Sequence, residues 1–101
     1  MNSNNEMKIE NGVLIVSGKK IPEIALAISS KTRLEILKRI QNREVDVEEL
    51  AKTLEQSRAN TSAQLRVLEK AGLVKTIYKP GIRGVKKICT SDIREIVFKL
   101  I

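Results

Sequence analysis

Apolar residues recur along this chain with two different spacings, which predict a mainly α domain of the α+β class. From residue 21 to residue 71, and again after residue 92, apolar positions recur every three or four residues, as on one buried helix face. Before residue 20, and from residue 73 to residue 90, short apolar runs flank turn sequences, as in β-hairpins. We therefore expect about five helices, a C-terminal hairpin and an added N-terminal hairpin.

The N-terminal hairpin is expected over residues 7–20, after a polar tail at 1–6. Its strands, Met7–Glu10 and Val13–Val16, flank Asn11-Gly12, a dipeptide that suits a two-residue turn because both central positions need positive φ. The second strand is apolar on both faces, so either the rest of the domain or a second subunit must cover it.

Four helices are expected between residues 21 and 71. The first begins near Pro22, and the next three have Ser30, Asp46 and Ser57 as N-cap residues. Gly72 permits a left-handed end after the fourth helix. The positions that we expect to face inward are Ile24, Ala25, Ile28, Leu34, Ile36, Leu37, Ile40, Leu50, Ala51, Leu54, Thr61, Leu65 and Leu68.

The third and fourth helices are separated by a short turn, the spacing of a helix-turn-helix motif whose second helix, about residues 57–71, is free to enter a DNA groove. Strands over 73–79 and 85–90, joined by a turn at 80–84, form the hairpin called the wing. Ser91 and Asp92 are expected to cap a last helix. Its apolar face consists of Ile93, Ile96, Val97, Leu100 and Ile101.

Composition excludes several classes of protein. The 101 residues suffice for one globular domain, expected over 21–101 after the N-terminal hairpin. Cys89 is the single cysteine and the chain has no histidine, so an internal disulfide, most zinc sites and most general-base chemistry are excluded. No apolar run is long enough to cross a bilayer, and no secretory signal precedes the domain. We expect a cytoplasmic protein that is not an enzyme, with no cofactor, no membrane partner and no evident small-molecule ligand.

The net charge is concentrated in one stretch. Residues 57–87 hold eight basic residues and one acid, Glu69, which gives +7, whereas the other seventy residues hold eleven of each sign. A solvated helix face is the ordinary explanation of such charge, but the single sign favours a polyanion. Aromatic side chains are scarce, with only Tyr78 and Phe98, and this scarcity favours duplex DNA over single strands, which are usually bound by base stacking.

Three segments carry a resemblance to a known family. Ser30–Leu37, Val47–Ala51 and above all Ser57–Val74 resemble the ArsR-type winged helix-turn-helix transcription regulators. The resemblance implies DNA binding and a homodimer formed by the first and last helices. The metal-sensing residues of that family are absent, because Asp46 and Glu48 occupy the first-motif positions and the last helix lacks histidine.

These observations predict a sequence-specific regulator of transcription, and a repressor is favoured because there is no room for a ligand domain. The alternatives are a nucleoid protein with little sequence preference and a winged-helix module that binds an acidic protein. The DNA-binding candidates are Ser57, Arg58, Asn60, Ser62, Ala63, Gln64, Arg66, Lys70, Lys79, Arg83, Lys86 and Lys87. The candidates for the dimer interface are Ile24, Ile28, Ile93, Ile96, Val97 and Leu100.

Overall fold

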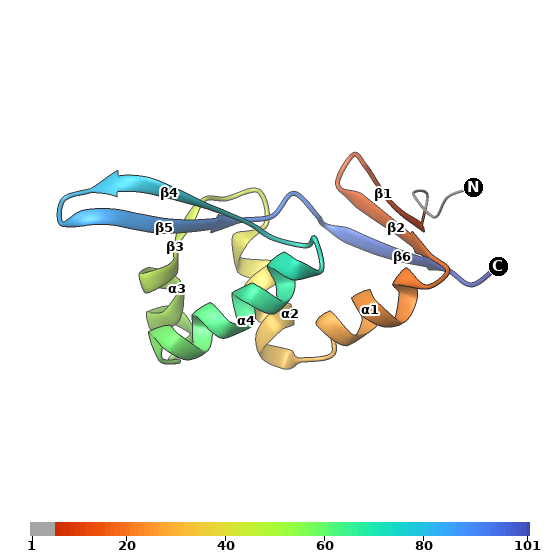
Figure 1. Ribbon diagram of the computed structural model, residues 1–101, viewed down its shortest axis with the longest axis horizontal. Coiled ribbons are helices and arrows are strands. Elements are labelled where there is room, and N and C mark those ends of the chain that lie inside the picture. The colour runs from red at the N-terminus through yellow and green to blue at the C-terminus, as the bar shows by residue number, and fades with distance from the viewer. Residues whose placement is uncertain (1–5) are drawn as a thin grey trace.

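A computed structural model describes residues 6–101, which form four helices and two three-stranded sheets. The sheets lie toward opposite ends of the long axis, and the helices lie below them in the view of Figure 1. The molecule is elongated, with principal extents of 49 × 25 × 20 Å. The elements are β1 (Met7–Glu10), β2 (Val13–Ser17), α1 (Lys20–Ala27), α2 (Lys31–Ile40), β3 (Val45–Asp46), α3 (Val47–Leu54), α4 (Arg58–Lys70), β4 (Lys75–Gly81), β5 (Gly84–Thr90) and β6 (Glu95–Lys99). The winged helix-turn-helix arrangement is confirmed.

The N-terminal hairpin forms as predicted. β1 and β2 pair antiparallel around Asn11 and Gly12, whose φ angles are 51° and 80°. On β2, Leu14 and Val16 are fully buried, so the body of the domain covers that face. Of the tail expected at 1–6, residues 1–5 lie outside the described residues.

The predicted last helix is wrong, because residues 95–99 form strand β6. β6 pairs in parallel with β2, giving a sheet in the order β1-β2-β6 that we call the terminal sheet. The spacing of Ile93, Ile96 and Val97 suits one face of a helix, but Ile96 and Phe98 also alternate with exposed neighbours. The inner edge of β2 needs a hydrogen-bonding partner, and this tertiary requirement decides between two local patterns of similar strength.

The helix caps and most of the core agree with the predictions. The hydroxyl of Ser30 accepts a hydrogen bond from the Arg33 amide, at 3.2 Å, and a carboxylate oxygen of Asp46 accepts one from the Glu48 amide, at 2.9 Å. After α4, Gly72 has a φ of +83°, and the Leu73 amide donates to the Leu68 carbonyl, which closes the predicted left-handed helix end.

Two inward-facing positions are wrong. Ala25 is exposed, and Ala27 takes the buried position beside Ile24 in α1. In α2, Ile36 and Ile40 lie in the core, whereas 42% of the Leu34 surface is exposed. Ile36 and Ile40 are four residues apart and therefore lie on one side of the helix, whereas Leu34, two residues before Ile36, lies about 160° around the helix from it.

The turn of the wing is shorter than predicted, and its first strand begins two residues later, at Lys75. β4 and β5 pair from Lys75 with Thr90 as far as Gly81 with Gly84, so only Ile82 and Arg83 form the tip. Gly84 has a φ of +107°, which a residue with a side chain rarely adopts. Figure 1 shows the wing extending past the helices at the end of the molecule opposite the terminal sheet.

Candidate nucleic-acid interface

The recognition helix, α4, buries one face and exposes the other. Thr61, Leu65 and Leu68 are fully buried, as predicted. Each residue of an α-helix is rotated by about 100° from the one before it, and this rotation places four small or basic residues on the side opposite the buried face. They are Ala59, Ala63, Arg66 and Lys70. The outer face therefore combines small residues that permit close approach with two cationic side chains.

Hydrogen bonds fix the first turn of α4. The Ser57 hydroxyl accepts from the Asn60 amide at 2.9 Å, and the Thr61 hydroxyl donates to the Ser57 carbonyl at 2.9 Å. The side-chain amide of Asn60 donates to the Gln56 side-chain carbonyl. Ser57 and Asn60 thus lie at the exposed start of the helix, where free backbone amides favour an anion. Ser62, another candidate, is half-buried.

The turn between the two motif helices forms without glycine. Glu55, at the end of α3, has a left-handed φ of 55°. Its amide donates to the Lys52 carbonyl and the Gln56 amide donates to the Ala51 carbonyl, at 3.1 and 3.0 Å. These bonds hold Glu55 in a conformation that usually favours glycine.

Gln64 points away from the exposed face of α4. Its side chain is half-buried and accepts a hydrogen bond from Arg33 Nη1 at 2.7 Å. The same guanidinium donates to the carbonyls of Ala27 and Leu26, at 2.6 and 3.3 Å. Arg33 therefore connects the end of α1 to α4 through Gln64, which gives Gln64 a packing role that the sequence pattern did not indicate.

Acidic side chains from residues 44–48 pair with three of the predicted DNA-binding cations. Arg58 lies 3.2 Å from a carboxylate oxygen of Glu48, and Lys86 lies 3.6 Å from one of Asp46. Lys79 pairs with Glu44. These acids are outside the basic stretch in sequence but beside it in space, because β3 pairs with β5. The candidates without an ion pair among residues 6–101 are Arg66, Lys70, Arg83 and Lys87.

The two faces of the wing differ in these pairings. Opposite residues of an antiparallel ladder share a face, so Tyr78 and Lys87 lie on one face, and Lys79 and Lys86 on the other. Thr76 belongs to the first face, and its hydroxyl donates to the Glu69 carboxylate of α4. The face with Tyr78 and Lys87 is therefore the one turned toward the recognition helix.

Tyr78 is a candidate that the charge pattern missed. Its exposed fraction is 67%, and it is opposite Lys87 on the face turned toward α4. A phenol hydroxyl there is able to donate a hydrogen bond to a phosphate oxygen. The sequence offered a signal for Tyr78: residues opposite each other in a hairpin share a face, and Tyr78 is opposite Lys87.

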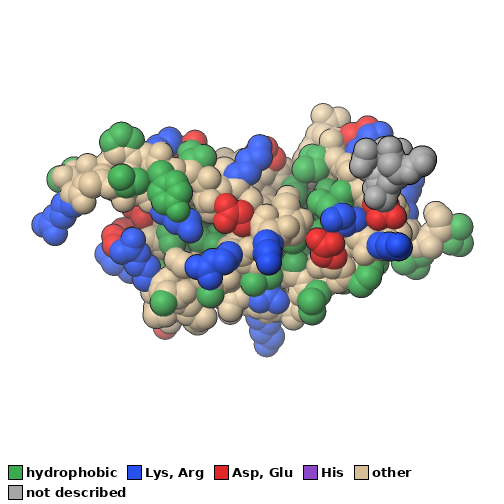
Figure 2. Space-filling view, viewed as in Figure 1, with side chains coloured by type: hydrophobic (Ala, Val, Ile, Leu, Met, Phe, Trp, Pro, Cys, Tyr) green, Lys and Arg blue, Asp and Glu red, His purple; other side chains and the backbone are tan. Residues whose placement is uncertain are grey.

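Figure 2 shows Lys and Arg side chains along α4 and at the far tip of the wing, and others next to acidic side chains at the end that holds the terminal sheet. Between the wing tip and the start of α3 lies a cleft of about 540 Å³, whose charged lining residues are Asp46, Glu48, Arg58, Arg83 and Lys86. The surface therefore consists of an exposed helix face beside a projecting hairpin, with Asp46 and Glu48 in the cleft and Glu44 and Glu69 exposed outside it. This shape suits an extended polyanion better than an enclosed ligand.

A family model described as the bacterial regulatory protein ArsR family matches residues 30–76. Reduced HlyU from Vibrio cholerae is 30% identical, with a TM-score of 0.63 over 71% of this chain and 72% of that chain. HlyU from Vibrio vulnificus is 29% identical, with a TM-score of 0.59 over 71% of each chain. No curated protein sequence matches the chain.

The chain belongs to the ArsR family. ArsR-family proteins are winged-helix DNA-binding regulators of transcription and not enzymes. The homodimeric winged helix-turn-helix DNA-binding domain Mb0332 from Mycobacterium bovis is 23% identical, with a TM-score of 0.63 over 72% of this chain and 64% of that chain, and shows the same fold.

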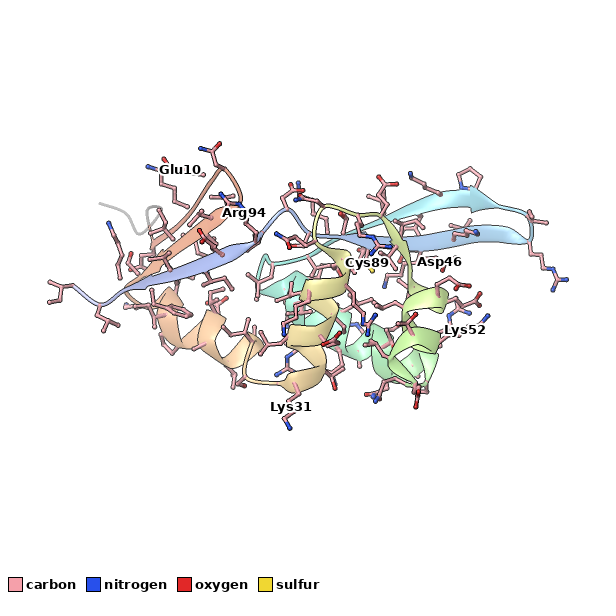
Figure 3. The ribbon with its side chains drawn as sticks, turned by 180° about the vertical axis from the view of Figure 1, so that it is seen from behind. Glu10, Lys31, Asp46, Lys52, Cys89 and Arg94 are labelled. Atoms are coloured by element: carbon pink, nitrogen blue, oxygen red, sulfur yellow. The ribbon has the colours of Figure 1, made fainter. Side chains whose placement is uncertain are left out.

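The acids that occupy the metal-sensing positions of the ArsR family have other roles in this member. Asp46 caps α3 with one carboxylate oxygen and lies near Lys86 with the other, and Glu48 pairs with Arg58. Figure 3 shows Asp46 at the start of α3. Within the described part of the chain, no three acidic, cysteine or histidine side chains gather as metal ligands would.

Cys89 is buried where the wing joins the body of this ArsR-family protein. Its thiol donates a hydrogen bond to the Val45 carbonyl at 3.4 Å. Burial raises the pKa of the Cys89 thiol to about 11, although the nearby Lys87 lowers it in part. The thiol is therefore uncharged at neutral pH, and a thiolate switch is disfavoured.

No helix in residues 6–101 has the length and apolarity needed to span a membrane.

Proposed function

We propose that this ArsR-family protein is a sequence-specific repressor of transcription that binds duplex DNA as a homodimer in the cytoplasm. The observation that carries the proposal is the set of free cationic groups on two adjacent elements. Arg66 and Lys70 lie on the outer face of α4, and Arg83 and Lys87 lie on the wing, all without an acidic partner among the described residues.

In this proposal α4 enters the major groove and the wing follows the backbone or the minor groove. Ala59 and Ala63 let the helix axis approach the bases, and Asn60, at the exposed start of the helix, pairs with adenine. Arg66, Lys70 and Lys87 neutralise phosphates, while the free amides at the helix start bind another. Arg83, at the tip, is the candidate for the minor groove.

The paired cations have a different role. Arg58, Lys79 and Lys86 each have a carboxylate partner, so a phosphate competes with an existing ion pair at each of them. Their net contribution to affinity is therefore smaller than that of the free cations. Gln64 supports the position of α4 through Arg33 and is not a base-reading residue in this proposal.

A homodimer accords with the Mycobacterium bovis domain of the same fold, which was solved as a homodimer. Two recognition helices related by a two-fold axis require two half-sites about 34 to 36 Å apart, and hence a palindromic operator. Occlusion of a promoter by such a dimer represses transcription without a further domain.

The decisive experiment selects bound duplexes from random and genomic fragments and then titrates the recovered site against competitor DNA. A recovered palindrome bound at least about a thousandfold more tightly than competitor supports the proposal. Equal binding to all duplexes establishes the nucleoid alternative instead. Absence of binding to any duplex at low salt contradicts DNA binding and favours the acidic-protein alternative.

Variants of α4 locate the interface on the protein. Arg66→Ala should weaken binding to every duplex, whereas Asn60→Ala should change the preferred sequence at one position of each half-site. Lys8→Ala is the matched control, because it removes one exposed positive charge from β1, at the opposite end of the molecule. Equal losses for Arg66→Ala and Lys8→Ala would show that α4 does not lie on the DNA.

A further inference from the structure

Strand β6 forms an open edge of the terminal sheet. In the order β1-β2-β6, it pairs only with β2 among the described strands. In the view of Figure 3, β6 is the strand of the terminal sheet nearest the viewer, and no further strand lies along its outer side. β6 contains no proline and its inward-facing residues are apolar, so its only charged residues are Glu95 and Lys99 at its two ends.

The backbone groups at this edge are defined by the pairing with β2. The Glu95 amide donates toward β2, to the Gly12 carbonyl at 3.3 Å. In a parallel ladder, alternate residues of a strand bond to the same neighbour, so Val97 and Lys99 also direct their backbone groups to β2. Ile96 and Phe98 therefore direct their amides and carbonyls to the open edge.

The sequence of β6 is complementary to itself in one antiparallel register. A two-fold axis at Val97 brings Ile96 opposite the partner's Phe98, and both residues have backbone groups directed outward, as a hydrogen-bonded pair requires. The same axis brings Glu95 opposite the partner's Lys99, and Lys99 opposite the partner's Glu95. Each interface thus gains two opposite-charge pairs on the outer face of the sheet.

These charges are not otherwise satisfied. Glu95 has only a 3.9 Å contact with Arg94, and Lys99 has no ion pair within residues 6–101. A shift of the register by one hydrogen-bonded pair in either direction places Glu95 opposite the partner's Val97 or opposite the partner's Ile101. Only the register centred on Val97 pairs both charges.

Apolar surface continues from this edge. Val97 is 42% exposed and Leu100 84% exposed. Beside the start of β6 lies an apolar groove of about 290 Å³, lined mainly by Ile28, Leu34, Leu37, Ile93 and Ile96. In the register centred on Val97, the partner's Leu100 lies opposite Arg94, next to this groove.

We propose that two copies of this chain associate through the open edges of β6, which pair antiparallel about Val97 and join two terminal sheets into one six-stranded sheet. The inference deepens the homodimer of the proposed function and does not depend on DNA. It replaces the predicted contact between a first and a last helix. Of the residues predicted for the interface, Val97, Leu100, Ile28 and Ile96 remain available, whereas Ile24 and Ile93 are buried in the protein's own core.

Charge exchange at Glu95 and Lys99 tests the register. Glu95→Lys alone places like charges opposite each other twice in a dimer, and Lys99→Glu alone does the same. Each single variant should self-associate about tenfold more weakly than the wild type in sedimentation equilibrium at low salt. Both side chains are exposed, so circular dichroism and thermal unfolding should show a fold like that of the wild type.

Two further samples make the test specific. The double variant Glu95→Lys, Lys99→Glu should regain the wild-type association, because both pairs are restored with reversed sign. An equimolar mixture of the two single variants should also associate at the wild-type level, since every pair in a mixed dimer joins opposite charges. Lys8→Glu is the control, because it changes charge in the terminal sheet but away from β6.

Hydrogen exchange gives an independent readout. The amides of Ile96 and Phe98 should be protected in wild-type protein at high concentration and exchange faster on dilution. The inference is overturned if the wild type is a monomer at millimolar concentration, if the single variants associate like the wild type, or if the mixture fails to recover. These variants leave α4 and the wing intact. If the protein still binds duplex DNA but fails these association tests, the β6 interface is wrong and the DNA-binding proposal stands.

Discussion

The two sheets of this protein have the same number of strands but opposite characters. The terminal sheet joins β2 to β6, which are some eighty residues apart in the chain, and its central strand holds the fully buried Leu14 and Val16. The wing is a local hairpin that carries Lys79, Lys86 and Lys87, and its tip residue Ile82 is 99% exposed. A sheet whose side chains complete the core contributes to stability, whereas a sheet that leaves the core has its side chains free for a partner.

The difference extends to electrostatics. The free cations proposed to bind DNA, Arg66, Lys70, Arg83 and Lys87, lie on α4 and the wing. The acids that pair with Arg58, Lys79 and Lys86 come from the neighbouring segment 44–48. At the terminal sheet the charges are few and balanced, as in the pair of Lys8 and Glu10. The comparison assigns polyanion binding to one end of the molecule and self-association to the other, and four predictions test this division.

The largest expected effect is on DNA affinity. If six to ten phosphates are engaged by α4 and the wing of a dimer, affinity should fall by about three to five orders of magnitude between 50 and 200 mM salt, because counterions are released on binding. Fluorescence anisotropy with a labelled duplex measures the slope. Self-association through the terminal sheet should change far less over the same range, and a flat response for DNA would contradict the division.

The next effect is on stability. Leu14→Ala should lower the free energy of unfolding by about 2 to 5 kcal/mol, because it leaves a cavity beneath the terminal sheet. Ile77→Ala, in the exposed part of the wing, should cost about 1 kcal/mol or less. Urea denaturation of both variants measures the difference. Similar losses would show that the wing is as much a part of the core as the terminal sheet.

A third prediction concerns the junction of the wing with the body. The folded-state pKa of Cys89, about 11, lies above the ordinary value of 9.0, so the stability that its burial supports is complete below pH 9 and is lost as the pH rises toward 11. Wild type should lose about 2 to 3 kcal/mol relative to Cys89→Val over this interval. Chemical denaturation of both proteins from pH 8 to pH 11 checks the difference, since lysine titration affects both alike; a constant difference would contradict it.

The smallest effect distinguishes the two faces of the wing. Lys87→Ala removes a free cation from the face turned toward α4 and should weaken duplex binding about fivefold, with the salt slope reduced by about one. Lys86→Ala removes a cation that already has Asp46 as a partner, so its effect should be smaller. Titrations of both variants at one salt concentration decide between them, and the reverse order would place the other face on the DNA.

The sequence predicted the elements whose formation depends on local chemistry. The Asn11-Gly12 turn, the caps at Ser30, Asp46 and Ser57, and the glycine end of α4 each depend on residues within a few positions of one another. The buried face of α4 also followed from spacing alone, because the helix has one strongly apolar side. The candidate cations were found in the same way, as a run of one sign.

Tertiary structure decided the features that depend on distant partners. Residues 95–99 satisfy both a helical and a strand pattern, and the unpaired edge of β2 selected the strand. The hydrogen bond from Arg33 holds the Gln64 side chain away from the exposed face. The acids of the segment 44–48 form ion pairs with Arg58, Lys79 and Lys86. The physical reason is common to all of them: a hydrogen bond or an ion pair needs a particular atom within about 3 to 4 Å, and local sequence does not specify which distant segment supplies it.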